Sequence, residues 1–149
     1  MNIKKTPYEN CLTQISFKIK TIEKNIVGIE ESLLSETKSS AGDKHETGRA
    51  MLQIEREKAG QQLLEVEKLK HVLKKIDYDF VSRKVGLGSV VFTTRYNYFI
   101  SVSMGEICIE NQSFYAISSQ TPIGRLLRGK QVGDLIEFNG RTFEILKVI

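Results

Sequence analysis

Apolar residues recur at alternating spacings of three and four through the first half of the chain. In the first stretch they are Leu12, Ile15, Ile19, Ile22, Ile26, Ile29 and Leu33. In the second stretch they are Leu52, Ala59, Val66, Leu69, Leu73 and Ile76, with Glu55 and Gln62 as polar members of the same repeat. This spacing is typical of the buried seam of a coiled coil. We therefore expect two amphipathic helices, from about Pro7 to Thr37 and from about Asp43 to Ile76.

A short polar stretch, residues 39–48, separates the two predicted helices. A connection this short cannot return the chain to the level at which the first helix begins. The second helix must therefore run antiparallel to the first, and the two seams are buried against each other. A helix of roughly thirty residues is about 45 Å long at 1.5 Å per residue. The sequence therefore predicts a helical hairpin over residues 1–79, with its tip near residues 40–48.

After Phe80 the pattern changes to short β-rich runs separated by glycines. Strands are expected within 85–92, 96–102, 107–109, 114–117, 134–138 and 142–148, and Asn139-Gly140 is a strong signal for a two-residue hairpin turn. Between them, Thr121 should cap a short helix that begins at Pro122 and stops at Gly129. The fold class is thus α+β, with a small antiparallel β domain and one short helix over residues 80–149.

Composition narrows the class of protein further. The chain has 149 residues, of which 40% are hydrophobic, enough to bury a core. Its net charge of +4 suits an anionic partner such as nucleic acid, but is also common in proteins that bind none. Cys11 and Cys108 lack the spacing of a zinc or redox site and are expected to be reduced core thiols. No run is apolar enough for a membrane span, so we expect a soluble, cytoplasmic protein with no membrane partner.

Two carboxylates at the predicted tip, Asp43 and Glu46, allow two interpretations. Asp-x-x-Glu is the pattern of a capping box, and acids in the first turn also suit the helix dipole. Alternatively, two carboxylates at the apex of a long hairpin form part of a site for a hard divalent cation. Mg²⁺ usually takes one or two protein carboxylates, while water and phosphate oxygens complete its shell. The two roles are compatible.

Several segments resemble the bacterial Gre transcript-cleavage factors. Gly42-Asp43-Lys44-His45-Glu46 is similar to the Gly-Asp-x-x-Glu at that family's hairpin tip. The stretch from Thr121 to Lys130 resembles the family's Ser-Pro-x-x-Arg-x-Leu-x-Gly-Lys segment, and Val132-Gly133-Asp134 continues it in the same way. Val85-Gly86-Leu87-Gly88-Ser89 is similar to the strand that opens the family's second domain. The resemblance implies a coiled-coil hairpin followed by a domain of FKBP-like fold.

The resemblance also implies a function as an accessory transcription elongation factor, which is not an enzyme by itself. Factors of this family bind RNA polymerase and pass their hairpin down its secondary channel, where the polymerase cleaves its own backtracked RNA. By this match Asp43 and Glu46 would assist catalysis and help hold a Mg²⁺ ion shared with the polymerase. Thr121, Pro122 and Arg125 would contact the polymerase. The nascent RNA 3′ end would be an indirect partner, through the polymerase. No small-molecule substrate is expected.

The chain departs from the family pattern directly after Glu46. Thr47-Gly48-Arg49-Ala50 stands where the family usually has Asn-Ala-Glu-Tyr, so a second acid and a tyrosine are missing. Three alternatives to cleavage stimulation therefore stay open. The chain could occupy the polymerase channel as a regulator without promoting cleavage, or it could be a coiled-coil adaptor whose tip acids are only caps. It could also be an FKBP-like prolyl isomerase, although its aromatic residues are scattered along the sequence.

Overall fold

The computed structural model describes residues 3–38 and 42–149. Its contacts divide the chain into two compact units. One is Gln14–Lys70, and the other combines Met1–Thr13 with His71–Ile149. The predicted domain boundary near residue 80 stays a prediction. No helix in the described part of the chain has an apolar stretch long enough to cross a membrane.

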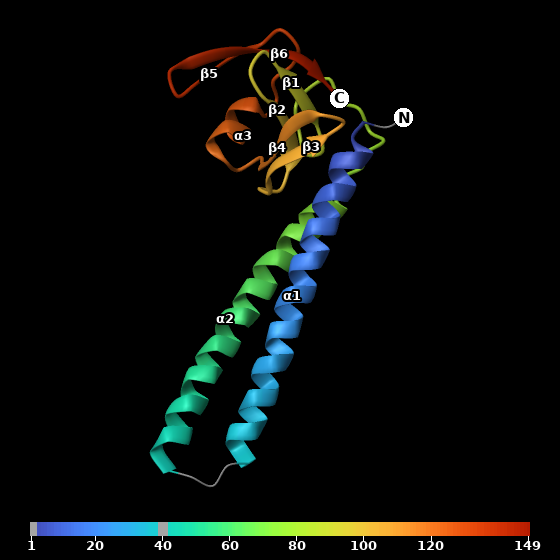
Figure 1. The fold of residues 1–149 in the computed structure, drawn as a ribbon. Coiled ribbons are helices and arrows are strands. Elements are labelled where there is room, and N and C mark those ends of the chain that lie inside the picture. The colour runs from blue at the N-terminus through green and yellow to red at the C-terminus, as the bar shows by residue number, and fades with distance from the viewer. Residues whose placement is uncertain (1–2, 39–41) are drawn as a thin grey trace. The chain divides into compact units, whose positions relative to one another are not determined.

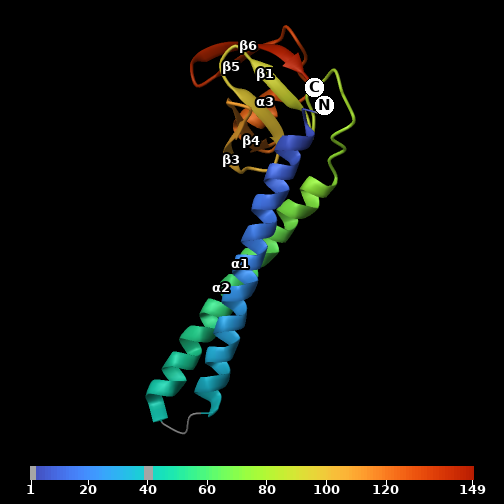
Figure 2. The same ribbon diagram turned by 45° about the vertical axis from the view of Figure 1, so that its right-hand side comes forward.

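Most of two long helices forms the unit Gln14–Lys70. They are α1, Lys5–Lys38, and α2, Gly42–Lys74. Within Gln14–Lys70 they lie side by side and antiparallel, as both views show (Figures 1 and 2). One hydrophobic cluster joins the two helices, and it consists of Ile22, Ile26, Ile29 and Leu33 from α1 with Leu52, Ala59 and Leu63 from α2. The predicted antiparallel hairpin is therefore confirmed.

The seam of α2 differs from the prediction at two positions. Glu55 and Gln62 are exposed, whereas Arg56 and Leu63, each one residue later, are half-buried. Arg56 Nε donates to Glu30 Oε1 across the hairpin at 3.1 Å, so the half-buried position carries a cation that is paired at its outer end. A long arginine can cover apolar surface with its stem while its head stays in water. The heptad pattern therefore placed these two seam positions one residue too early.

The β domain contains one six-stranded sheet in the order β3-β4-β2-β1-β6-β5. The strands are β1 Val90–Thr93, β2 Asn97–Ser101, β3 Gly105–Ile109, β4 Gln112–Ser118, β5 Leu135–Phe138 and β6 Arg141–Val148. Four of the neighbouring pairs are antiparallel, but β2 and β4 run parallel. The α+β fold class is confirmed, and the expectation of a purely antiparallel sheet is wrong at this one pair. In the sheet, β4 lies between β3 and β2. The β3–β4 hairpin therefore places β4 beside β2, and the two strands run in the same direction.

Two tight turns have left-handed backbone conformations. Asn139 and Gly140, with φ of 52° and 74°, join β5 to β6, as the Asn-Gly pair predicts. Glu110 and Asn111, with φ of 51° and 65°, join β3 to β4 without a glycine, so the sequence carries only a weak signal for this turn. Each turn fixes the register of its hairpin.

One hydrophobic cluster packs α3 and the strand β5 against the neighbouring strands of the β domain. Its buried members are Val85, Val91, Tyr98, Ile100, Leu127, Ile136, Phe143 and Ile145. The two cysteines differ, because Cys11 is buried whereas Cys108 is exposed. Cys108 follows the buried Ile107 in the edge strand β3, and successive side chains in a strand point to opposite faces. The expectation that both cysteines are core thiols is therefore wrong for Cys108.

Candidate functional site

The predicted tip residues lie at the start of α2. This helix begins at Gly42, so Asp43 and Glu46 both fall in its first five residues. Residues three apart on a helix share a face. The Glu46 side chain is exposed, while the predicted tip residues Ser40 and Ala41 lie outside the described residues. The backbone therefore places the two acids on one side of the helix start.

The position of Asp43 bears on its role as a cap. An N-cap residue stands before the first helical residue, with a non-helical backbone. Asp43 is instead the second residue of α2, and Glu46 is the fifth. The side chain of Asp43 lies outside the described residues, so the capping box stays a prediction. An acid in the first helical turn still interacts favourably with the positive end of the helix dipole.

A third acid, Glu36 of α1, lies against the start of α2. A Cβ built on Gly48 would be 3.7 Å from Glu36 Oε1. At that distance a Cβ would make only an ordinary van der Waals contact, so the Glu36 carboxylate lies beside Gly48 of α2. Sequence reasoning missed Glu36 because it belongs to the other helix, three residues before the polar stretch.

The donor atoms near the tip are hard oxygen ligands of the kind that Mg²⁺ prefers. Among the described side chains, no group of three His, Cys, Asp or Glu residues is placed to hold a metal ion. The resemblance would have Asp43 and Glu46 supply two carboxylates, with water and a partner completing the Mg²⁺ shell.

The second group of predicted site residues belongs to α3, Pro122–Leu127. Thr121 caps this helix, because its Oγ1 accepts a hydrogen bond from Gly124 N at 3.1 Å. The same hydroxyl donates to Ser118 O at 2.7 Å, which fixes the chain entering the helix. Pro122 is the first helical residue, and Gly129, with φ of 78°, follows the last turn. The predicted cap, start and stop are all confirmed.

The two sides of α3 differ in what they contact. Leu127 is fully buried and Ile123 packs against the core cluster. Gly124 is also buried, and a Cβ there would lie only 2.2 Å from Ser118 O, so the helix fits closely against the preceding strand's end. Pro122 and Arg125 are exposed. The structural role and the proposed docking role thus use different faces of one helix.

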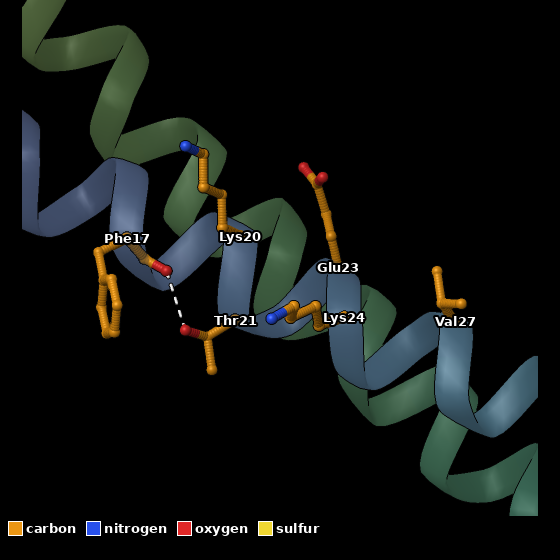
Figure 3. A pocket seen from close by; sticks show the side chains of 6 residues that line it. All are labelled: Phe17, Lys20, Thr21, Glu23, Lys24 and Val27. Carbon is orange, nitrogen blue, oxygen red and sulfur yellow. Dashed lines mark hydrogen bonds between the residues drawn. The ribbon is translucent and has the colours of Figure 1, made fainter.

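The outer face of α1 carries a shallow hollow lined by apolar, charged and hydroxyl side chains. Figure 3 shows its six lining residues, Phe17, Lys20, Thr21, Glu23, Lys24 and Val27. Phe17 is 71% exposed and Val27 52%, so neither contributes to the seam. Thr21 Oγ1 donates to Phe17 O at 3.0 Å, within the helix itself. This face provides a surface control for substitutions in the seam.

Aromatic residues that are far apart in sequence come together in the β domain. Tyr96, Tyr98, Phe138 and Phe143 line one pocket, together with Arg95 and two further polar residues. These residues are scattered along the sequence but lie together in three dimensions. One signal was available in the sequence. Two turns each carry an aromatic residue and an arginine, namely Arg95-Tyr96 and Phe138-Asn139-Gly140-Arg141.

The structure assigns the two groups of predicted residues to different compact units. Glu46 lies within Gln14–Lys70, and Thr121, Pro122 and Arg125 lie within His71–Ile149.

Comparisons with known proteins add little to this picture. No protein-family model matches the chain, and no curated protein matches it either. Among solved structures, the chain is similar to one described as the structure of the transcription factor Gfh1. The two share 17% sequence identity over 92% of each chain, with a TM-score of 0.36. At so low a TM-score, the similarity supports no argument about function.

Proposed function

We propose that this chain is a transcription factor of the Gre type, which binds RNA polymerase and promotes the polymerase's own cleavage of backtracked RNA. The observation that carries the proposal is the position of Asp43 and Glu46. Both lie in the first five residues of α2, directly after the break in an antiparallel helical hairpin. The resemblance of this stretch to the Gre tip gives the two carboxylates a specific role.

The carboxylates would act through an ion held jointly with the polymerase. Bound Mg²⁺ would lower the pKa of an attacking water and stabilise charge on the RNA phosphate. The task of Asp43 and Glu46 is to supply negative oxygen ligands that raise the occupancy of a weakly held ion. Amide side chains of the same shape would lack that charge. The factor is thus an accessory to the polymerase and would not act as an enzyme alone.

Docking on the polymerase would use the exposed face of α3. Thr121 is occupied in capping the helix, so the contacting side chains would be Pro122 and Arg125, which are exposed. Arg125→Glu should weaken polymerase binding while leaving the cap and the buried face intact. Arg83→Glu, at another exposed arginine of the same unit, is the matched control. Equal binding by both variants would place the docking surface elsewhere.

The deciding experiment compares cleavage with and without the tip charges. The double variant Asp43→Asn with Glu46→Gln is assayed on a stalled, backtracked transcription complex at limiting Mg²⁺. Its control is Glu55→Gln with Glu57→Gln, which removes the same charge from exposed positions further along α2. We expect the tip variant to compete with wild type for polymerase but to lose stimulation, and higher Mg²⁺ should partly restore it.

The outcomes separate the remaining functions. Equal stimulation by wild type and the tip variant would show that the tip acids have no part in cleavage. Binding to polymerase without stimulation by either protein would support a regulator that occupies the channel. Absence of polymerase binding would overturn the whole proposal and favour a coiled-coil adaptor.

A further inference from the structure

Two turns of the β domain line a pocket that the proposed function does not use. One turn joins β1 to β2 and contributes Arg95 and Tyr96, and the other joins β5 to β6 and ends at Arg141. Tyr98 and Phe143 form part of the wall. The cavity has a volume of about 360 Å³, within the range of small-ligand sites.

The first turn is held rigidly by one buried threonine. Thr93 Oγ1 accepts hydrogen bonds from Arg95 N at 3.1 Å and Tyr96 N at 3.0 Å, and it donates to Tyr96 O at 2.5 Å. Thr93 is only 7% exposed, so water competes little for these bonds. The backbone that carries Arg95 and Tyr96 is therefore fixed before any ligand arrives.

The second turn is equally constrained and is tied to the first. Phe138 pairs with Arg141 across the Asn-Gly turn. Thr94 N donates to Glu144 O at 3.0 Å, and Glu144 N donates to Thr94 Oγ1 at 3.0 Å. These bonds connect the β1–β2 turn to strand β6, which Arg141 begins. A site whose parts are fixed in advance loses little conformational entropy when it binds a ligand.

The wall of the pocket is aromatic. Tyr98 and Phe143 are 7% and 5% exposed, and their ring centroids are 6.5 Å apart. Tyr115 meets the ring of Tyr96 edge to face at 5.4 Å and lies 6.4 Å from Tyr98. Such rings offer apolar contact area and favourable geometry to another planar ring. The buried part of the site thus suits an aromatic or heteroaromatic group.

The mouth of the pocket is positively charged. Arg95 and Arg141 are both exposed, and among the ion pairs of the described residues neither guanidinium has an acidic partner. The Arg95 guanidinium lies 5.0 Å from the centroid of the Tyr96 ring. Burial raises the pKa of the Tyr98 hydroxyl, and the charge of Arg95 opposes that rise. The hydroxyl is therefore protonated at neutral pH and can donate a hydrogen bond.

We propose that this pocket binds a small anion that carries a planar ring, of the chemical class of a nucleoside monophosphate. The ring would contact the aromatic wall, and the phosphate would be bound by Arg95 and Arg141, because guanidinium groups form charge-assisted bidentate bonds with phosphate. The rigid turns and the size of the cavity favour a small ligand over a helix or an extended strand. This proposal is independent of the proposed function.

The test uses adenosine monophosphate, adenosine and inorganic phosphate as separate probes for the full-length protein. Binding is followed by isothermal titration calorimetry and by amide chemical shifts in NMR spectra. We expect adenosine monophosphate to bind at least about tenfold more tightly than either fragment, because only it engages both the wall and the arginines. The largest shifts should fall in the β1–β2 and β5–β6 turns.

Single variants identify the contacts. Arg95→Gln and Arg141→Gln should each weaken adenosine monophosphate binding by about tenfold, since one charge-assisted contact is lost. Arg83→Gln, which removes an exposed arginine outside the pocket, should bind like wild type. Unchanged affinity in both pocket variants would overturn the proposal. So would phosphate binding as tightly as the nucleotide, or no nucleotide binding at millimolar concentration.

Discussion

Ile26→Asp should remove most of the stability of the helical hairpin. Ile26 is 8% exposed and packs in the cluster that joins α1 to α2, beside Ile29 and Ala59. Removing a buried isoleucine side chain costs about 2–5 kcal/mol, and an unpaired carboxylate in the same place adds its desolvation. We therefore expect a loss of about 4 kcal/mol or more. A domain is stable by only about 5–15 kcal/mol in total, so this loss should unfold much of the hairpin.

The neighbouring residue provides a matched control. Val27 is 52% exposed on the outer face of α1 (Figure 3). Val27→Asp introduces the same charge into the same helix, but surface substitutions usually change stability by less than about 0.5 kcal/mol. Urea denaturation, followed by far-ultraviolet circular dichroism, should separate the two variants clearly. Equal losses of stability in both would refute the assignment of the seam.

Two further predictions concern stability. Gly28→Ala should stabilise the hairpin by about 0.5–1 kcal/mol, because alanine favours a helix and a Cβ at this position meets no atom within 4 Å; a lower melting temperature would contradict this. Burial raises the pKa of the Cys11 thiol above its ordinary value of 9.0, so the folded state holds this proton more tightly than the unfolded state. Stability should therefore fall as the pH rises above about 9, and this part of the fall should be absent in Cys11→Ala.

The sequence predicted the hairpin well because its signal is local and repeated. Every predicted seam position of α1 from Leu12 to Leu33 is buried or half-buried in the structure. The seam of α2 was less certain, because its repeat contains polar residues and the pattern alone cannot tell Glu55 from Arg56. The ion pair between Arg56 and Glu30 joins residues 26 positions apart, and no local pattern reveals it.

The β strands were also found, but their neighbours were not all predictable. Strand periodicity predicts which residues face the same side of a sheet, but not which strands are neighbours. Only the Asn139-Gly140 turn predicted a pairing of strands, that of β5 with β6. The parallel pairing of β2 with β4 depends on where the intervening hairpin folds. That pairing places Tyr98 directly opposite Tyr115. The aromatic pocket was missed because its lining comes from two distant turns, β1–β2 and β5–β6, which the pairing of β1 with β6 brings together.

The helix α3 shows the opposite case. Thr121, Pro122 and Gly129 each act within a few residues of themselves, through a side-chain cap, a fixed φ and a positive φ. These effects need no distant partner, so the sequence alone predicted them. What it could not predict is that Gly124 must be glycine, because the atom that excludes a side chain there belongs to Ser118 before the helix.

The role of Asp43 in the fold can be separated from its proposed role in catalysis by varying salt. If Asp43 acts on the helix only through the dipole, Asp43→Ala should cost about 0.3–1 kcal/mol at low salt. That cost should largely vanish at about 1 M salt, where the screening length falls to roughly 3 Å.

A capping hydrogen bond would behave differently. Its loss costs about 0.5–2 kcal/mol and does not depend on a long-range field, so the cost should persist at high salt. Since Asp43 is the second residue of α2, we expect the salt-sensitive result from denaturation of Asp43→Ala and wild type at the two salt concentrations. A loss that is the same at both would support the capping interpretation instead.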